Sequence, residues 1–233
     1  MKKENIIFIV IVVVLLIVLF AVAFNSKPKK ENVKEDLKGV DFTMNGNIGN
    51  LDKYTTENPV AALYIKNYGA VIIELYPSVA PNTVNNFISL IKSGFYDNNT
   101  FHRLMPGFVL QGGDPTGTGT GGPGYTIKGE FTNNGFTNNL KHTKGVVSMA
   151  RNSVSMDSAG SQFFIMLGES NYLDGDYAAF GKVIDGMDIV EKIEKNERVA
   201  NSQSGELQTN LVLEKAIIDL KGKEYPEVEK LSE

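Results

Sequence analysis

The sequence contains no cysteine. Without thiols the chain can form no disulfide, no thiolate zinc site, no cysteine nucleophile and no acylated lipoprotein cysteine. This absence names no compartment, because a chain without thiols is indifferent to the redox state around it. Basic residues are not in excess: 23 Lys and Arg stand against 27 Asp and Glu, for a formal net charge of -4. A role in following nucleic-acid phosphates is therefore not expected.

Histidine is scarce, with only His102 and His142 present. A histidine-based metal site would need carboxylate ligands as well, and no spacing in the sequence supports one. A serine hydrolase needs a serine, a histidine and a carboxylate in reach of one another, and either histidine is a candidate. The Gly-x-Ser-x-Gly turn of one large hydrolase class is missing from the sequence. His102 by itself is expected to be a hydrogen-bonded structural histidine rather than a base.

Glycine and threonine fill the stretch "DPTGTGTGGPGY", which runs from Asp114 to Tyr125. Gly117, Gly119 and Gly122 formally match the glycine pattern of dinucleotide-binding proteins. That pattern requires a helix to open at its end, so that the helix N-terminus can face the pyrophosphate. Pro123-Gly124 predicts a turn instead, and no Gly-Lys-Ser/Thr follows to make a P-loop. We therefore expect a loop with no nucleotide role.

The chain begins with an apolar segment. Residues Ile6 to Phe24 carry no charge and show no polar face, unlike a helix packed in a protein core. At about 1.5 Å per residue the segment spans roughly 28 Å, close to the thickness of the hydrocarbon layer. We expect residues 1–24 to form one uncleaved transmembrane helix, a signal anchor. Cleavage as a signal peptide is the alternative, since Lys2-Lys3 precedes the segment and Ala21-Val22-Ala23 resembles a cleavage site.

The orientation of this helix is not decided by charge, because lysines flank both of its ends. A short basic head before a long apolar run favours an inside N-terminus with an extracytoplasmic globular part, or a secreted protein if the signal is cleaved. Residues 25–47 are polar and rich in lysine and glutamate, which predicts a tether. The alternative is an additional strand near residues 40–44.

The remainder is rich in strand patterns. Two apolar runs separated by Lys66 to Gly69 predict a β-hairpin. Residues 81–92 follow helical spacing, with Val84, Phe87, Ile88 and Ile91 on one face, Pro81 in the first turn and Gly94 beyond the end. The segment "GMDIVEKIEK" predicts a shorter helix with Ile189, Val190 and Ile193 facing inward, and "LVLEKAIIDLKG" predicts a closing strand. Few helices and no alternation of strand and helix indicate a closed or sandwiched antiparallel sheet with flanking helices.

Arg103 lies in an unusual setting within "FHRLMPGFVLQGGD", between apolar residues on both sides. Further along, "SQFFIML" places Gln162 and Phe164 on one face of a predicted strand and Phe163 on the other. An arginine and glutamines beside an aromatic floor would form an apolar pocket with a few aimed donors, suited to a small apolar group next to a carbonyl. The alternative is that Arg103 only pairs with a surface carboxylate.

These segments resemble the cyclophilin-type peptidyl-prolyl cis/trans isomerases. The similarity runs from about residue 59 to residue 220 and includes Ile73–Tyr125, "GVVSMARNS", "SAGSQFFIML" and "YLDGDYAAFGKVIDGMDIVEKI" in order and spacing. It implies a mainly β fold over residues 48–222, a closed eight-stranded antiparallel barrel capped by two α-helices, with residues 223–233 left as a polar tail. It also implies rotation about X–Pro bonds without a metal or cofactor, in a monomer that acts on proline-containing polypeptides and assists folding of exported or surface proteins.

The resemblance assigns the site residue by residue. It places Arg103, Phe108 and Gln111 in catalysis. It places the following residues in substrate binding: His102, Val109, Ala150, Arg151, Gln162, Phe164, Tyr172, Leu173 and Tyr177.

The sequence departs from the family pattern at a few of these positions. Many members have methionine at the place of Val109 and asparagine at the place of Arg151, and many eukaryotic members have tryptophan and histidine where Tyr172 and Tyr177 stand. Cyclosporin binding is therefore expected to be weakened. A module that binds proline-containing segments without catalysis is the alternative function, although the complete set of matching side chains favours the enzyme.

Overall fold

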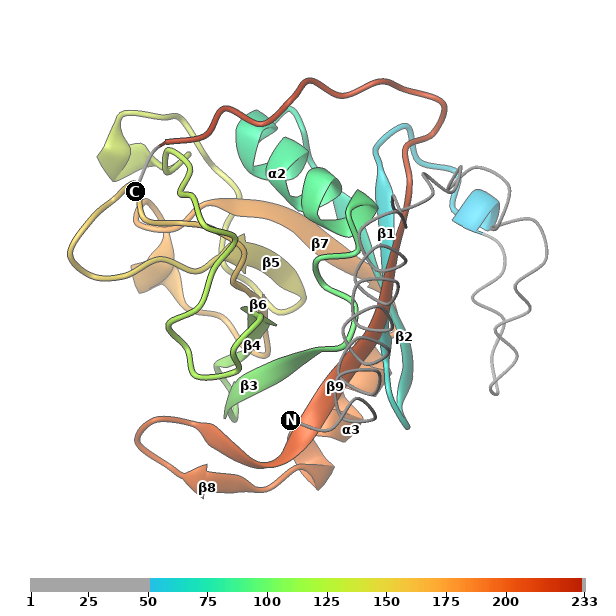
Figure 1. Ribbon diagram of the computed structural model, residues 1–233, viewed down its shortest axis with the longest axis vertical. Coiled ribbons are helices and arrows are strands. Elements are labelled where there is room, and N and C mark those ends of the chain that lie inside the picture. The colour runs from blue at the N-terminus through green and yellow to red at the C-terminus, as the bar shows by residue number, and fades with distance from the viewer. Residues whose placement is uncertain (1–50, 232–233) are drawn as a thin grey trace, which may run out of the picture. The chain divides into compact units, whose positions relative to one another are not determined.

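The computed structural model describes residues 51–231 of the chain (Figure 1). The expected membrane helix, residues 1–24, and the expected tether, residues 25–47, lie outside the described residues. Within residues 51–231, no helix is both long and apolar enough to cross a membrane.

Eight antiparallel strands close into a barrel, as the sequence comparison with the isomerase family implied. The ring closes because β9 pairs with β1 as well as with β3. A short additional strand, β8 (Val199–Asn201), forms a hairpin with β9 at the edge of the ring. In their order around the barrel the eight strands are β1 (Val60–Ile65), β2 (Gly69–Leu75), β7 (Ala179–Asp185), β5 (Val146–Met149), β6 (Phe163–Met166), β4 (Val109–Asp114), β3 (Asn99–Met105) and β9 (Glu206–Asp219).

The predicted hairpin is formed by β1 and β2, which pair in register from Val60↔Glu74 to Ile65↔Gly69. Its turn includes two residues in left-handed conformations, Asn67 with φ of 68° and Gly69 with φ of 121°. Asparagine and glycine tolerate positive φ better than other residues, so this turn chemistry fixes the position of the hairpin in the sequence.

The first predicted helix, α2, spans Pro81–Lys92 and begins with the expected proline. Its four expected inward residues are all buried, and Gly94 beyond its end has φ of 72°. The first backbone N–H groups of a helix need partners from outside it. The carboxylate of Glu130 supplies them, accepting from the N–H of Asn82 at 3.0 Å and of Thr83 at 2.8 Å.

The second predicted helix, α3, spans Met187–Asn196. Val190 and Ile193 are buried in the core as expected, and Ile189 is partly buried against it. The N-terminal neighbour of the helix, Gly186, has φ of 81°, and a Cβ there would lie 2.4 Å from the carbonyl oxygen of Ala70. Glycine is therefore required where α3 meets β2.

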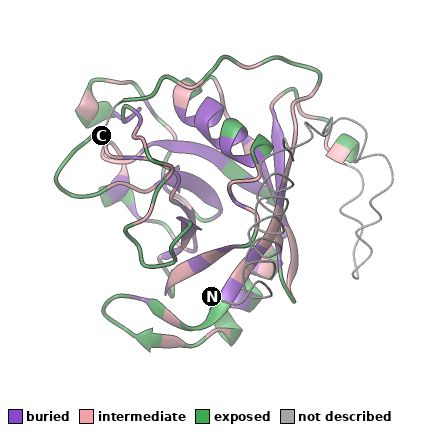
Figure 2. Ribbon diagram, viewed as in Figure 1, coloured by how far each residue is buried: buried purple, intermediate pink, exposed green. Residues whose placement is uncertain are grey.

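Aromatic side chains belong to the main core. Figure 2 shows the buried residues along α2, β5 and β7, three of the elements around this core. The ring centre of Phe87 in α2 lies 5.1 to 5.3 Å from those of Tyr96, Phe163 and Phe180, and each pair is tilted or edge-on. Such pairs add to the burial energy of the rings. Phe163 belongs to this core, whereas its neighbour Phe164 belongs to a second apolar cluster, as strand alternation predicted. Since side chains fill the core, a substrate site must lie outside it.

Three short 3₁₀ turns, η1 (Leu51–Lys53), η2 (Thr132–Asn134) and η3 (Asn171–Leu173), complete the described elements. The segment after β9 runs across α2 (Figure 1). Asn82 and Glu229 exchange two hydrogen bonds of 2.9 Å, and Leu231 forms an isolated bridge with Thr126. The described part of the expected polar tail is thus packed on the domain.

Candidate active site

The predicted site residues are brought together by the order of three strands. Arg103 on β3 lies opposite Gln111 on β4, and Gln111 lies opposite Phe164 on β6. Directly opposed residues in antiparallel strands point to the same face of the sheet. Arg103, Gln111 and Phe164 therefore form one row on the outer face of the barrel, although Arg103 and Phe164 are 61 positions apart in the sequence.

Arg103 is held by two hydrogen bonds that leave its charge free. Its Nε donates to the carbonyl oxygen of Ser204 at 2.9 Å, and Nη1 donates to Oε1 of Gln111 at 3.1 Å. The guanidinium carbon lies 6.0 Å from the centre of the Phe108 ring. Among residues 51–231, no carboxylate lies within ion-pair distance of Arg103. The alternative of a simple surface ion pair is thus not what the described residues form.

The glutamines extend this network into the glycine-rich loop. Nε2 of Gln111 donates to Oε1 of Gln162 at 3.0 Å. Nε2 of Gln162 in turn donates to the carbonyl oxygens of Gly119 and Gly121 at 3.0 and 2.9 Å. These hydrogen bonds make the glycine-rich loop a wall of the site. No helix begins directly after this segment, which is a loop as the sequence predicted.

Asp114 holds the loop in shape from within. Its carboxylate accepts hydrogen bonds from the backbone N–H groups of Thr116, Gly119 and Gly121 at 2.7, 2.6 and 3.1 Å, and from the Thr116 hydroxyl. Burial alone would raise the pKa of Asp114, but these hydrogen bonds outweigh it and place the pKa below its ordinary value. The loop anchor is therefore charged at neutral pH.

The apolar side chains of the predicted site gather in the second cluster. Val109, Phe164 and Leu173 are buried there together with Met166, which the sequence comparison did not single out. The remaining predicted members, Phe108, Ala150 and Tyr177, are partly buried against them. Tyr172 is 69% exposed, and its ring lies 5.9 Å from that of Phe108. The cluster provides an apolar surface beside the guanidinium of Arg103.

Arg151 lies at another edge of this cluster. Its guanidinium carbon is 4.9 Å from the ring centre of Tyr177 and 5.4 Å from that of Phe131. Nε donates to the backbone oxygen of Asp176 at 2.8 Å, and Nη1 donates to that of Asn152 at 2.9 Å. The ring of Tyr177 meets that of Phe164 edge-on, with centres 5.8 Å apart. The structure thus connects Arg151 to the floor of the pocket.

One expectation for His102 is wrong. Both of its ring nitrogens are buried and lack a hydrogen-bond partner among the described residues, so it is not a hydrogen-bonded structural histidine. Burial lowers its pKa, and the charge of nearby Arg103 acts in the same direction, whereas Asp114 opposes the change. The ring lies under the glycine-rich loop, 3.8 Å from where a Cβ on Gly119 would stand. A neutral ring here acts as packing for the loop.

A serine, a histidine and an aspartate do meet, behind the pocket. Nε2 of His142 is 3.0 Å from the hydroxyl of Ser148, and Nδ1 is 3.0 Å from Oδ1 of Asp174. The distances resemble those of a hydrolase triad. However, Ser148 is 0% and His142 1% exposed, so no substrate can reach the hydroxyl. The imidazole instead stacks on Phe164 with ring centres 6.1 Å apart, which supports the pocket floor.

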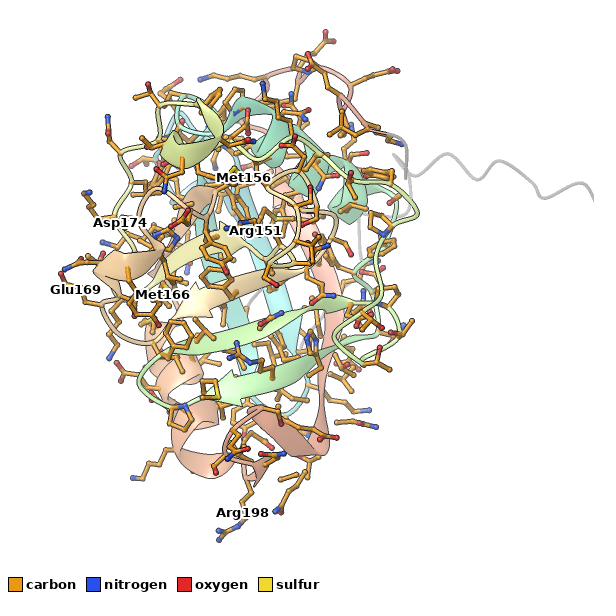
Figure 3. The ribbon with its side chains drawn as sticks, turned by 90° about the vertical axis from the view of Figure 1, so that its left-hand side faces the viewer. Arg151, Met156, Met166, Glu169, Asp174 and Arg198 are labelled. Carbon is orange, nitrogen blue, oxygen red and sulfur yellow. The ribbon has the colours of Figure 1, made fainter. Side chains whose placement is uncertain are left out.

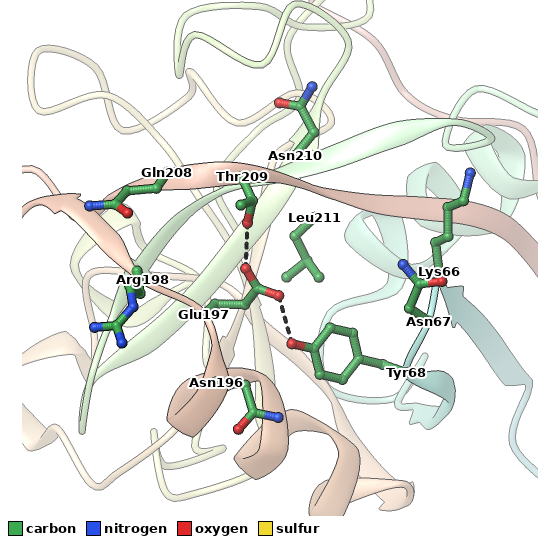
Figure 4. Close-up of a pocket in the computed structure, with 10 residues that line it drawn as sticks. All are labelled: Lys66, Asn67, Tyr68, Asn196, Glu197, Arg198, Gln208, Thr209, Asn210 and Leu211. Carbon is green, nitrogen blue, oxygen red and sulfur yellow. Dashed lines mark hydrogen bonds between the residues drawn. The ribbon is translucent and has the colours of Figure 1, made fainter.

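Two hollows of the described surface lie away from these residues. One, of about 740 Å³, separates α2 from residues 220–230. The other, of about 450 Å³, lies between Tyr68, the end of α3 and β9 (Figure 4). There Glu197 accepts hydrogen bonds from Thr209 and from Tyr68, and burial together with this bond raises the pKa of Tyr68 to about 12. Glu197 therefore connects the end of α3 to the β1–β2 turn and to β9. No predicted site residue lines either hollow.

The sequence did not reveal every group of the site. Ser204 contributes a backbone oxygen, which any residue type possesses, and it stands 101 positions from Arg103. Its signal was the run "NSQSG", a turn composition before the closing strand. Chemically, the arrangement offers a fixed cation and amide donors beside an apolar surface. Such a site can bind a small ring and hold an adjacent carbonyl or nitrogen.

This geometry places a fixed arginine beside an apolar cluster on the outside of a closed antiparallel barrel, and comparison with known proteins supplies the family. Residues 60–217 match the model of the "cyclophilin type peptidyl-prolyl cis-trans isomerase" family. Peptidyl-prolyl cis-trans isomerase B of Bacillus subtilis is 49% identical over 124 residues, which cover 53% of this chain and 82% of the relative. The peptidyl-prolyl cis-trans isomerase of Helicobacter pylori is 43% identical over 133 residues, which cover 56% of this chain and 78% of the relative.

A solved structure agrees with this match. The crystal structure of a cyclophilin-type peptidyl-prolyl cis-trans isomerase of Cryptosporidium parvum, obtained in the presence of the dipeptide Ala-Pro, aligns with a TM-score of 0.62 at 35% identity. It covers 69% of this chain and 98% of the other. The chain belongs to the cyclophilin-type peptidyl-prolyl cis-trans isomerase family, and its activity is that of the family.

Proposed function

We propose that Arg103 and the second apolar cluster perform the isomerisation. A peptide bond resists rotation because of its partial double-bond character, with a barrier of about 18–20 kcal/mol. In the twisted transition state this resonance is lost and the proline nitrogen regains its lone pair. A donor that interacts with that nitrogen, or holds the neighbouring carbonyl, binds the twisted amide better than either planar isomer. Only such differential binding accelerates the reaction.

The observation that carries this proposal is the way Arg103 is held. Hydrogen bonds to Ser204 and Gln111 fix the guanidinium, while no carboxylate among the described residues neutralises it. A preorganised charge costs little reorganisation when the amide twists. In this proposal Phe108, Phe164 and Leu173 hold the proline ring and exclude water. No bond is made or broken, so rotation requires neither a proton donor nor a cofactor.

A direct test is exchange of an X–Pro peptide followed by NMR. The spontaneous reaction takes tens to hundreds of seconds. We expect catalytic amounts of the chain to bring exchange into the range of milliseconds to seconds. Binding of the peptide with unchanged exchange would refute catalysis and favour the alternative function, a module that holds proline-containing segments. The Ala-Pro dipeptide named with the Cryptosporidium structure supports the choice of a prolyl peptide as ligand.

We further propose that residues 6–24 anchor the enzyme in a membrane, with the N-terminus inside and the catalytic domain outside. The uncharged sequence of this segment and the basic residues before it support the proposal. An enzyme in that place would assist folding of exported or surface proteins. Protease added to intact cells should then digest the catalytic domain. Full protection until lysis would overturn the extracytoplasmic location.

A further inference from the structure

Arg151 is fixed in place beside the pocket by four separate contacts. Two aromatic rings lie within 4.9 and 5.4 Å of its guanidinium carbon, and two backbone oxygens accept its Nε and Nη1 hydrogens. An arginine has five N–H donors, so three remain available. A guanidinium that is already ordered loses little conformational entropy when it binds another group.

The charge of Arg151 is not neutralised within the described part of the chain. The carboxylates close in sequence to Arg151 or to its neighbour Tyr177 have other partners: Asp176 accepts from an asparagine amide at 2.9 Å, Asp174 pairs with a lysine at 3.3 Å, and Asp157 accepts a backbone N–H at 2.9 Å. No ion pair involving Arg151 occurs among residues 51–231, and the same holds for Arg103. Two uncompensated cations therefore accompany the apolar cluster, in a chain whose formal net charge is -4.

The two arginines lie at opposite ends of one line of contacts. Arg103 bonds to Gln111, Gln111 pairs across the sheet with Phe164, Phe164 meets Tyr177, and Tyr177 lies beneath Arg151. A peptide whose proline covers Phe164 would extend past the pocket on at least one side. Its neighbouring side chains would then pass within reach of the second cation.

We propose that Arg151 gives this isomerase a preference for X–Pro segments that carry an aspartate or glutamate within a few residues of the proline. The inference rests on the isomerase activity and names the substrate class of that same site. A carboxylate there can form a charge-assisted, two-pronged hydrogen bond with the free donors of the guanidinium. Because the molecule as a whole is acidic, the preference comes from the local field at the pocket and not from general attraction.

The test uses the full chain in detergent micelles and pairs of X–Pro peptides that differ only by glutamate or glutamine. The acidic residue is placed in turn at each position up to about three residues from the proline, the reach of an extended segment of roughly 10 Å. For the best position we expect the glutamate peptide to exceed its glutamine partner by about threefold in kcat/KM at low salt. The ratio should approach one as added salt screens the charges.

Three variants separate the proposal from a general charge effect. Arg151→Gln should bring the ratio of the two peptides to about one, and Arg151→Lys, which keeps the charge, should retain part of it. Arg198→Gln makes the same change of charge far from Arg151 (Figure 3) and should leave the ratio as in the parent. A ratio near one in the parent, a ratio that does not change with salt, or one that persists in Arg151→Gln would overturn the preference.

The glutamine peptides distinguish this failure from a failure of the activity itself. Accelerated exchange of the neutral peptide with equal rates for its acidic partner would refute the preference alone. Unchanged exchange of every peptide would refute the activity. In that case the dissociation constants from the same titrations still test whether Arg151 favours acidic segments.

Discussion

At the scale of the residue, the site depends on how arginines divide their donors. Arg103 and Arg151 each use Nε and Nη1 to bind oxygens of the protein and keep the other donors available. This division orders the side chain without neutralising it. A lysine in either place would carry the charge but could not be fixed in a plane. The type of residue therefore matters as much as its charge.

Burial of His142 makes the stability of the protein depend on pH. Burial lowers its pKa, and the hydrogen bond to Asp174 offsets this only in part. Below the ordinary value of 6.5 the unfolded chain then binds more protons than the folded one, so the free energy of unfolding falls as pH falls. His142→Gln should flatten the change in stability between about pH 7.5 and about pH 5.5, measured by urea unfolding. Burial lowers the pKa of His102 as well, so His102 still contributes its own part of the pH dependence of stability in this variant. A slope equal to that of the parent would contradict this account.

At the scale of the element, local signals predicted elements that the structure confirms. Pro81 and Gly94 bound α2, and the turn at Asn67 and Gly69 bounds the first hairpin. Closure of the barrel had no local signal, because β1 and β9 pair between residues as distant as Val60 and Asp219. That part of the fold came from family resemblance. Among the site groups, side chains could be named in advance, whereas the backbone oxygen of Ser204 could not.

The β8–β9 turn supplies that oxygen, and Asn201 shapes the turn. Oδ1 of Asn201 accepts from the N–H of Gln203 at 2.9 Å and of Ser204 at 3.3 Å, and Leu104 donates to the oxygen of Gly205 at 2.7 Å. Asn201→Ala should loosen the turn and lower kcat about threefold to tenfold through misplacement of Arg103. KM should change little, and the Nε–H signal of Arg103 should exchange faster with water.

Asn201→Asp is the matched control, because an aspartate oxygen can accept the same two hydrogen bonds. It should retain most of the activity and the slow exchange of Arg103 Nε–H. Loss of activity in Asn201→Ala with an unchanged Arg103 signal would show that the turn acts by another route.

At the scale of the whole molecule, the segment after β9 joins the end of the chain to α2 and to the loop before η2. It adds the two hydrogen bonds between Asn82 and Glu229 and the bridge between Leu231 and Thr126. Tyr225 and Val228 pack against the main core, and Lys230 lies 4.3 Å from the ring of Tyr125. These contacts cover α2 and leave the pocket, on β3, β4 and β6, untouched.

Ending the chain after Leu220 should therefore lower stability without lowering activity. The lost hydrogen bonds and apolar contacts correspond to about 2–4 kcal/mol in the free energy of unfolding. Chemical denaturation measures this loss of stability. Asn82→Ala removes only the two hydrogen bonds to Glu229 and should lower the free energy of unfolding by about 1 kcal/mol. An unchanged unfolding midpoint in the shortened chain would show that the segment contributes nothing to stability.

The central claim is that Arg103 binds the twisted amide more tightly than either planar isomer. One NMR measurement tests it: the rate of exchange at saturating X–Pro peptide, together with the dissociation constant, for the parent and Arg103→Ala. The account predicts that the bound exchange slows by about a hundredfold or more. It predicts that the dissociation constant changes by no more than about threefold. Weaker binding with an unchanged rate at saturation would show that Arg103 only holds the peptide, and would contradict the claim.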